Sequence, residues 1–433
     1  MYSILLICCM ALMTLLFRAH CVRAGKIHIN PVCGFLVGLT FYVLLPSCVV
    51  AYASDDIAEM TAYGYYFTPA NATGVMALTL VLLVAFWVGT RIPRRVLPTR
   101  PRPVPPNGAA RRVVGINTST WLLFGSFALL LVLAWSIRDS LFTGYQESML
   151  ENDAIGSAKG TISSLYSMMY VSTCAIVLLQ RGAVPRALAR AMIVVFVVAS
   201  VILLSLGARL YVAMALLSLL ALRSWLQDGI PVMRLLPYLL GGAAAFGTVG
   251  VLRSESLSGL SSVVLNIALE PLLTSISLYT LITDNPMILI GKVYMFAGDF
   301  QAILPSFLFP GKAGLFERLN DYGFVFEAPL GGFHLYFSSL INFGVLGTVV
   351  LAVFVGHTLA RLSRDPRSLR RSQNLTAIVL TGTLVFTVFR DPFFISLVKN
   401  VFVMAILVPK VITGVTLYGT TTRQLPRPAD GTP

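Results

Sequence analysis

The sequence predicts an all-α polytopic membrane protein. Of its 433 residues, 57% are hydrophobic and only 12% are charged, and the mean hydropathy is +0.82. This composition is too apolar for a soluble globular protein. Apolar runs long enough to cross a bilayer as helices recur along most of the chain. The formal net charge of +14 does not indicate a nucleic-acid partner, because the arginines are concentrated in short connections between these runs, as topology signals are.

We expect about eleven transmembrane helices in a single integral membrane domain, 1–433. The first run has no basic residue before it and no small-residue cleavage site after it, so it is interpreted as an uncleaved span. The stretch 191–222 would be about 48 Å long as one helix, which predicts two short spans separated at Gly207 and Ala208. The predicted spans are 2–17, 31–53, 74–90, 120–137, 161–180, 191–206, 210–222, 230–252, 336–360, 375–389 and 394–418.

The distribution of charge predicts the orientation. Basic residues mark cytoplasmic connections. Most of the 32 Lys and Arg lie in segments 18–28, 91–118, 181–190, 223–234, 361–371 and 410–433, whereas most acidic residues lie in the other connections. The N-terminus is therefore expected to be periplasmic and the C-terminus cytoplasmic.

Two connections are unusually long. The segment 91–118 is rich in Pro and Arg and is expected to be an extended cytoplasmic loop. The segment 253–335 is expected to be a large periplasmic loop. Its apolar stretches 257–283 and 287–309 are interpreted as interfacial helices that lie on or dip into the outer face. The alternative is a membrane hairpin, which would leave His334 on the same side.

A histidine marks the end of the large loop. The stretch 331–347 reads GGFHLYFSSLINFGVLG, so that His334 directly precedes a long apolar run. Gly344 and Gly347 share about the same helical face, which predicts close packing against a neighbouring helix. An imidazole with a pKa near neutrality can take a proton from a hydroxyl. The alternative is an interfacial histidine at the end of a membrane helix.

External arginines supply candidate anion-binding groups. Arg209 is the one charge in the stretch 191–222; a charge at that depth is costly and predicts an anionic partner, the alternative being an arginine that reaches lipid phosphate. Arg390 lies next to Asp391, and this pair could instead stabilise a turn. Arg253 and Arg318 lie in the large loop. The planar guanidinium suits two-point binding of pyrophosphate oxygens.

These residues together predict a reaction. A sugar hydroxyl would attack the anomeric carbon of a lipid-pyrophosphate-linked glycan, with His334 acting on the hydroxyl and arginine stabilising the departing pyrophosphate. No nucleotide is needed. A metal site is not predicted, although the acidic clusters of the external loops leave a divalent cation as the alternative.

The spacing of His334, nine residues, Gly344, two residues and Gly347 resembles the signature of O-antigen ligases and O-antigen polymerases. Leu335 departs from that signature, which usually has Asn, Ser or Gln after the histidine. The helix count and the large loop before the histidine-bearing helix are also similar to that family, over most of the chain. The family's histidine maps onto His334 and its mid-chain arginine onto Arg209, and a second family arginine corresponds to Arg253 or Arg318.

The resemblance implies a protein of the bacterial inner membrane, similar in architecture to the glycosyltransferase C superfamily and independent of metal. It implies polymerisation of undecaprenyl-pyrophosphate-linked repeat units on the periplasmic face. Besides this glycan and membrane lipids, the expected partners are a chain-length regulator and a flippase.

Three other functions stay open. A ligase would move the finished glycan to lipid A core. A polysaccharide or lipid transporter would show inverted repeats, broken helices and charges near the bilayer midplane. A non-catalytic assembly subunit would tolerate loss of His334 and Arg209.

Overall fold

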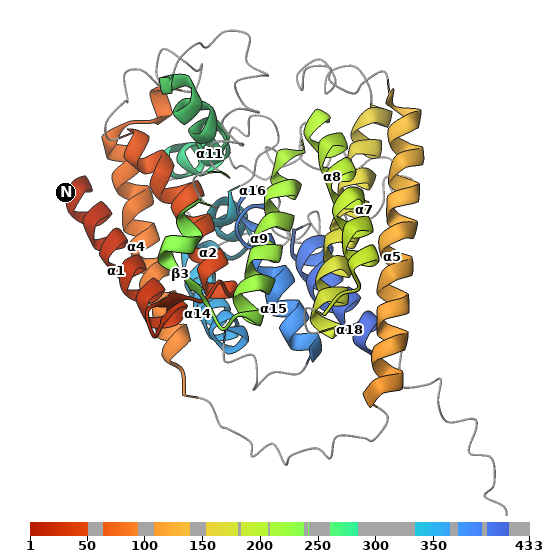
Figure 1. The fold of residues 1–433 in the computed structure, drawn as a ribbon. Coiled ribbons are helices and arrows are strands. Elements are labelled where there is room, and N and C mark those ends of the chain that lie inside the picture. Colours follow the sequence, from red (N-terminus) through yellow and green to blue (C-terminus); the bar gives the residue numbers. More distant parts are fainter. Residues whose placement is uncertain are drawn as a thin grey trace, which may run out of the picture.

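The computed structural model describes residues 1–50, 64–93, 108–138, 153–180, 183–206, 208–237, 241, 260–284, 334–363, 371–391 and 396–414. Within these residues, nine helices are long and apolar enough to cross a membrane, and they run side by side as a bundle (Figure 1). The chain is thus a multi-pass membrane protein by helix length and composition. The nine spans are Tyr2–Cys21, Pro31–Val50, Pro69–Arg91, Ile116–Ser136, Gly160–Leu179, Arg186–Ser205, Arg209–Leu226, Leu335–Leu362 and Ser396–Thr413.

The elements that form these spans are α1 (Tyr2–Cys21), α2 (Pro31–Leu39), α4 (Pro69–Arg91), α5 (Gly108–Ser136), α7 (Asp153–Leu179), α8 (Arg186–Ser205), α9 (Arg209–Leu226), α14 (Leu335–Leu362) and α18 (Val408–Gly414), together with the π-helices η1 (Thr40–Leu44) and η8 (Ser396–Leu407). Here η1 continues α2, and η8 leads into α18. A short 3-10 helix, η2 (Gly64–Tyr66), precedes α4.

The expected division of the stretch 191–222 is confirmed. Helix α8 ends at Ser205 and α9 begins at Arg209, so the two form a tight helical hairpin. Arg209 is the first residue of α9, at the end of the bundle that is uppermost in Figure 1.

Two expected segments differ from the structure. The span 375–389 is divided into α15 (Arg371–Thr383) and the short α16 (Thr387–Arg390). A glycine and several β-branched residues, in the run GTLVFTV, weaken helix propensity there. Helix α5 begins at Gly108, so residues 108–118 are helical and not part of an extended loop; prolines end at Pro106. Most of the span 230–252 lies outside the described residues.

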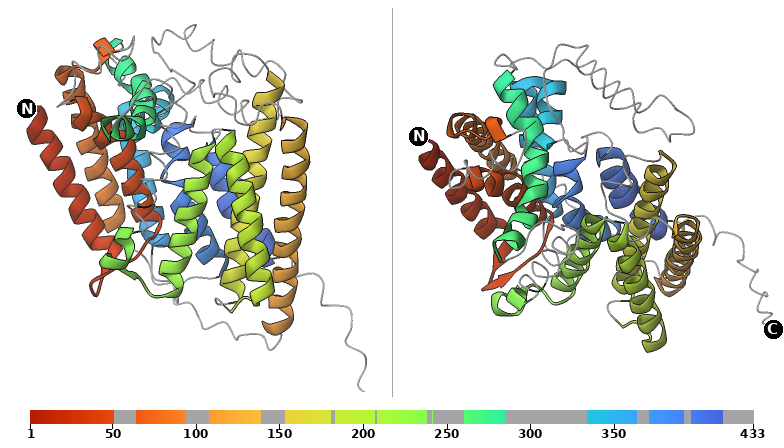
Figure 2. Two further views of the ribbon diagram at one scale, coloured as in Figure 1. Left: turned by 45° about the horizontal axis from the view of Figure 1, so that its top comes forward. Right: turned by 90° about the horizontal axis from the view of Figure 1, so that it is seen from above.

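The two ends of the bundle are closed differently. At one end, β1 (Val22–Arg23), β2 (Lys26–Ile27) and β3 (Ile230–Pro231) form a small antiparallel sheet. At the other end, α11 (Leu260–Asp284) lies across the ends of the other helices, which are seen nearly end-on in the right-hand view of Figure 2. Helix α11 covers most of the stretch 257–283, for which a helix was expected. The second expected helix, 287–309, lies outside the described residues.

Glycines let several helices touch through their backbones. A Cβ at Gly34 of α2 would collide with the carbonyl oxygen of Thr381 in α15. Gly89 of α4 and Gly356 of α14 stand in the same relation to the backbone of the opposite helix. Small residues are the usual means of close helix approach in membranes.

The role predicted for Gly344 and Gly347 is wrong. Gly344 has φ 64° and ψ −174°, so it kinks α14 instead of lying on a regular helical face. A Cβ at Gly347 would meet the Cβ of Phe343 on the same helix, at 2.5 Å. Gly344 therefore permits the kink, because only glycine adopts such a positive φ without strain, and Gly347 leaves space for the side chain of Phe343.

Candidate functional site

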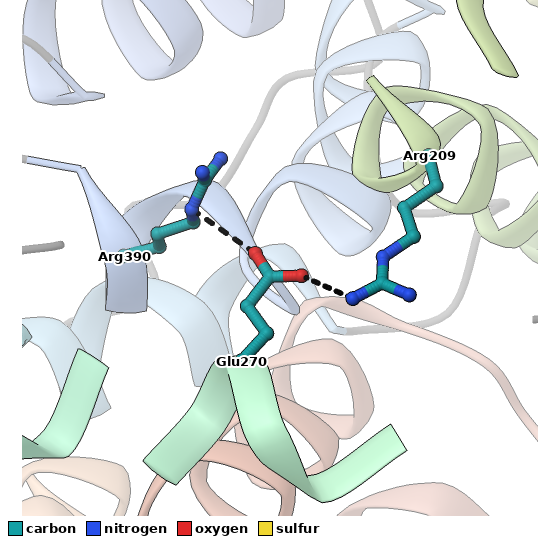
Figure 3. Close-up of polar contacts among 3 residues, drawn as sticks. All are labelled: Arg209, Glu270 and Arg390. Atoms are coloured by element: carbon teal, nitrogen blue, oxygen red, sulfur yellow. Dashed lines mark hydrogen bonds and ion pairs between the residues drawn. The ribbon is translucent and has the colours of Figure 1, made fainter. Parts of the chain in front are cut away.

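Two arginines converge on one carboxylate at the end of the bundle covered by α11 (Figure 3). Nη2 of Arg209 lies 3.3 Å from Oε2 of Glu270, and Nε of Arg390 lies 3.0 Å from Oε1 of the same side chain. The three side chains are 20%, 19% and 27% exposed, in the order Arg209, Glu270 and Arg390. This Arg209–Glu270–Arg390 cluster is half-buried, carries one net positive charge and can be reached from solvent.

Three separate elements supply the cluster. Arg209 starts α9, Glu270 lies in the middle of α11, and Arg390 ends α16. Helix α16 stops there because Asp391 precedes Pro392 and adopts an extended backbone with ψ 154°. The site therefore exists only when α9, α11 and α16 are assembled.

An aromatic column holds α16 in place. Phe389, next to Arg390, is fully buried; its ring lies 6.0 Å from that of Tyr42 with the planes 3° apart, and 5.5 Å from that of Phe35. Phe35 in turn stacks on Phe86 of α4 at 4.9 Å. Aromatic pairs at these distances add to the energy of burial. Packing around Phe389 thus fixes the backbone that carries Arg390, independently of Glu270.

The fully buried Tyr42 of η1 connects the aromatic column to the charged cluster. Its phenol interacts electrostatically with Glu270, Arg390 and Arg209. Within the described residues, the Tyr42 hydroxyl has no hydrogen-bond partner. π-Helical turns such as η1 are frequent at functional sites.

His334 is the N-cap of α14 and is completely buried. Its Nδ1 accepts a hydrogen bond from the backbone N–H of Tyr336 at 3.1 Å, and its own backbone N–H donates to Oγ of Ser277 in α11 at 3.2 Å. The imidazole packs edge-on against Tyr336 and Phe389, with centroids 5.1 Å and 6.3 Å away. Capping and aromatic contacts together determine the orientation of the ring.

This geometry limits the proton chemistry of His334. Because Nδ1 accepts a hydrogen bond, the neutral ring carries its hydrogen on Nε2. Burial lowers the pKa of His334 to about 3, although the nearby backbone carbonyl of Tyr42 opposes this shift. The side chain is therefore neutral at physiological pH and is placed to donate a hydrogen bond from Nε2, not to remove a proton.

Helix α11 serves both parts of the site. Glu270 and Ser277 are seven residues apart, so they lie on the same face of the helix. Glu270 meets the two arginines and Ser277 meets the backbone of His334. The far end of α11 is tied down by Tyr279 against Phe67, with rings 5.1 Å apart.

The structure brings together Arg209 and Arg390, and it links them to His334 through Tyr42 and Phe389. Arg253 and Arg318 lie outside the described residues. Sequence reasoning missed the role of Glu270, although a signal was present: it is the one acidic residue within the apolar stretch 257–283, and such residues indicate function. No sequence signal distinguishes Tyr42.

Comparison of the chain with protein-family models, with curated proteins and with solved structures gave no match.

Proposed function

We propose that this protein is a glycosyltransferase that polymerises undecaprenyl-pyrophosphate-linked oligosaccharide repeat units on the periplasmic face of a bacterial inner membrane. The observation that carries the proposal is the convergence of Arg209 and Arg390 at the covered end of the bundle. Paired guanidiniums in a half-buried site suit a pyrophosphate, because each offers several donors in a fixed plane.

In the proposed reaction, a sugar hydroxyl of one repeat unit forms a bond to the anomeric carbon of another. The bond between that carbon and the pyrophosphate oxygen breaks, the lipid pyrophosphate leaves with the electron pair, and the hydroxyl proton is released to water. Arg209 and Arg390 stabilise the charge that develops on the leaving group. His334 positions α14 and the site aromatics, because its Nδ1 is engaged in the helix cap.

A second observation bears on the alternative of a transporter. The pair α15 and α16 is discontinuous and α14 is kinked, and broken helices are typical of transporters. The charged cluster, however, involves the first residue of α9 and a helix that lies across the end of the bundle (Figures 1 and 2). Charges at an end of the bundle favour the enzyme over a transporter with a midplane site.

The test uses the purified full-length protein with an undecaprenyl-pyrophosphate-linked repeat unit, without nucleotide or added metal, and resolves the products on a gel. A ladder of lengthened lipid-linked glycan is expected from the wild type, and Arg209→Ala and Arg390→Ala should each reduce it by about a hundredfold or more. Arg138→Ala is the matched control, because Arg138 is an exposed arginine after α5 that stacks on Trp135.

Other results would redirect the proposal. Transfer of glycan only after lipid A core is added would identify a ligase. A ladder that survives both arginine substitutions would retain the polymerase and reject this site. Absence of transfer in either assay, with a folded protein, would contradict the enzyme and favour transport or assembly.

A further inference from the structure

Glu270 occupies the space between two arginines that, in the proposed function, bind the pyrophosphate of the donor. Its two carboxylate oxygens each face a different guanidinium, from opposite sides (Figure 3). Two oxygens of a phosphate are spaced similarly to those of a carboxylate, so a phosphate can accept the hydrogen bond from Arg209 and form the ion pair with Arg390 in place of Glu270. A phosphate that takes this position must displace Glu270.

We infer that Glu270 is an internal competitor for the anion site: its carboxylate holds the arginines in the unliganded protein and gives way to a phosphate of the ligand. The inference rests on the proposed function for the identity of the ligand as a lipid pyrophosphate. The displacement itself concerns only the three charged side chains.

The backbones that carry the two arginines are held by contacts that do not depend on Glu270. Arg390 follows Phe389, which is anchored between Phe35 and Tyr42. Arg209 is fixed by the start of α9 in the hairpin with α8. When the carboxylate leaves, the backbone positions of both arginines therefore stay the same, and their guanidiniums can turn to an incoming anion.

The backbone at Glu270 is suited to such a movement. Pro271 lies within α11, where it lacks an N–H and cannot complete the hydrogen bond to the fourth residue before it. Helices bend at such points. The cluster is also partly open to solvent, since Glu270 is 19% exposed, so a ligand can reach it without unfolding the bundle.

Competition of this kind has a consequence for turnover. The lipid pyrophosphate released by glycosyl transfer keeps the phosphates through which the donor was bound, so arginines without the competing Glu270 carboxylate would also hold the product tightly. Glu270 returns to the arginines as the product leaves, which limits the affinity of the site and favours release. We therefore expect Glu270→Gln to lower both KM and kcat in the polymerisation assay.

The primary experiment measures binding of inorganic pyrophosphate to the purified full-length protein by titration calorimetry. Glu270→Gln should tighten binding by about tenfold, because it removes a negative charge a few ångströms from the ligand while keeping the side-chain shape. Arg209→Ala and Arg390→Ala should each weaken binding by about tenfold or more. If Glu270→Gln does not fold, Glu270→Ala makes the same test.

Asp284→Asn is the matched control. Asp284 ends the same helix, about 21 Å along its axis from Glu270, and accepts a hydrogen bond from Tyr66, so it tests loss of an acidic charge on α11 away from the arginines. Its affinity for pyrophosphate should be unchanged. Equal tightening in both variants would show a general charge effect and would overturn the inference.

Weaker or unchanged pyrophosphate binding by Glu270→Gln would also overturn it, since Glu270 would then support the arginines and not compete with the ligand. Repeating the series with farnesyl pyrophosphate tests the source of the ligand. If Glu270→Gln binds inorganic pyrophosphate more tightly but not farnesyl pyrophosphate, a lipid-linked donor is rejected. If Glu270→Gln binds pyrophosphate more tightly but the wild type transfers no glycan, the proposed function is refuted. The displacement of Glu270 by a phosphate would still stand.

Discussion

His334 shows how a single side chain can differ from the role its position suggests. The residue was expected to act on a hydroxyl, but its Nδ1 caps α14 and its ring is buried among aromatics. The N-cap residue of a helix usually has an extended backbone, and His334 has ψ 143°. Nothing in the residue type reveals this, because it depends on where the helix begins.

Stability should depend on pH through His334. Its pKa in the folded protein is about 3, below the ordinary value of 6.5, so between these values the unfolded chain binds a proton that the folded protein does not. Stability is therefore full above about pH 6.5 and decreases as the pH falls, by about 2 kcal/mol at pH 5.

This pH dependence is tested by thermal unfolding of the wild type and of His334→Asn in detergent, measured from pH 5 to pH 7.5. Asparagine is a good N-cap and does not titrate, so the variant should lose less stability on acidification. Equal pH dependence in the two proteins would contradict the buried, neutral histidine. A wild-type glycan ladder whose pH profile follows a group near 6.5 would contradict it as well.

Glu270 illustrates the converse case: the sequence carried a signal of function, a single acidic residue in an apolar stretch, which sequence reasoning missed. Glu270 and Pro271 interrupt the apolar stretch 257–283 of the sequence, yet α11 continues through both residues. The acidic side chain is accommodated because two arginines from other elements neutralise it. An unpaired carboxylate at this depth would be costly.

Among the elements, the close contact between α2 and α15 is the most sensitive to a small change. Gly34 and Gly38 lie four residues apart on α2, in the sequence GFLVG, and both face the segment that leads to Arg390. Gly34 touches Thr381, and Gly38 touches Leu384 and Phe389. This GxxxG pattern is visible in the sequence and is typical of helix contacts in membranes.

Gly34→Ala should destabilise the protein by about 1–3 kcal/mol, because the added methyl group has no space and must push α15 away. The measurement is thermal unfolding of the purified protein in detergent. Gly125→Ala is the control, since a Cβ there meets no atom within 4 Å on α5, and it should leave stability unchanged or slightly raised. Equal stability of Gly34→Ala and the wild type would refute this packing.

For the molecule as a whole, the positive-inside pattern and the fold lead to one expected topology. The end that carries α11 and the Arg209–Glu270–Arg390 cluster is expected to face the periplasm, and the small sheet β1–β2–β3 is expected to face the cytoplasm. In this arrangement, the exposed Tyr65 of η2 and the exposed Gln227 after α9 lie on opposite sides.

Cysteine labelling in intact cells tests this topology. In a variant without the six native cysteines, a membrane-impermeant maleimide should label Tyr65→Cys before permeabilisation and Gln227→Cys only after it. Labelling of both positions in intact cells would contradict the multi-pass arrangement. The reverse pattern would invert the molecule and place the arginines in the cytoplasm, where the proposed reaction has no substrate.

The amino-acid sequence alone determined the class of the protein, most of its spans and the division between α8 and α9, because hydropathy and helix length are local properties of the chain. It also identified Arg209 and Arg390 as candidate site residues, since charges stand out in apolar surroundings. The tertiary structure decided that these arginines share Glu270, that Tyr42 and Phe389 lie beside them, and that His334 is a buried cap. These relations join residues that are up to 347 positions apart, as Tyr42 and Phe389 are, and only the packing of several helices brings them within contact distance.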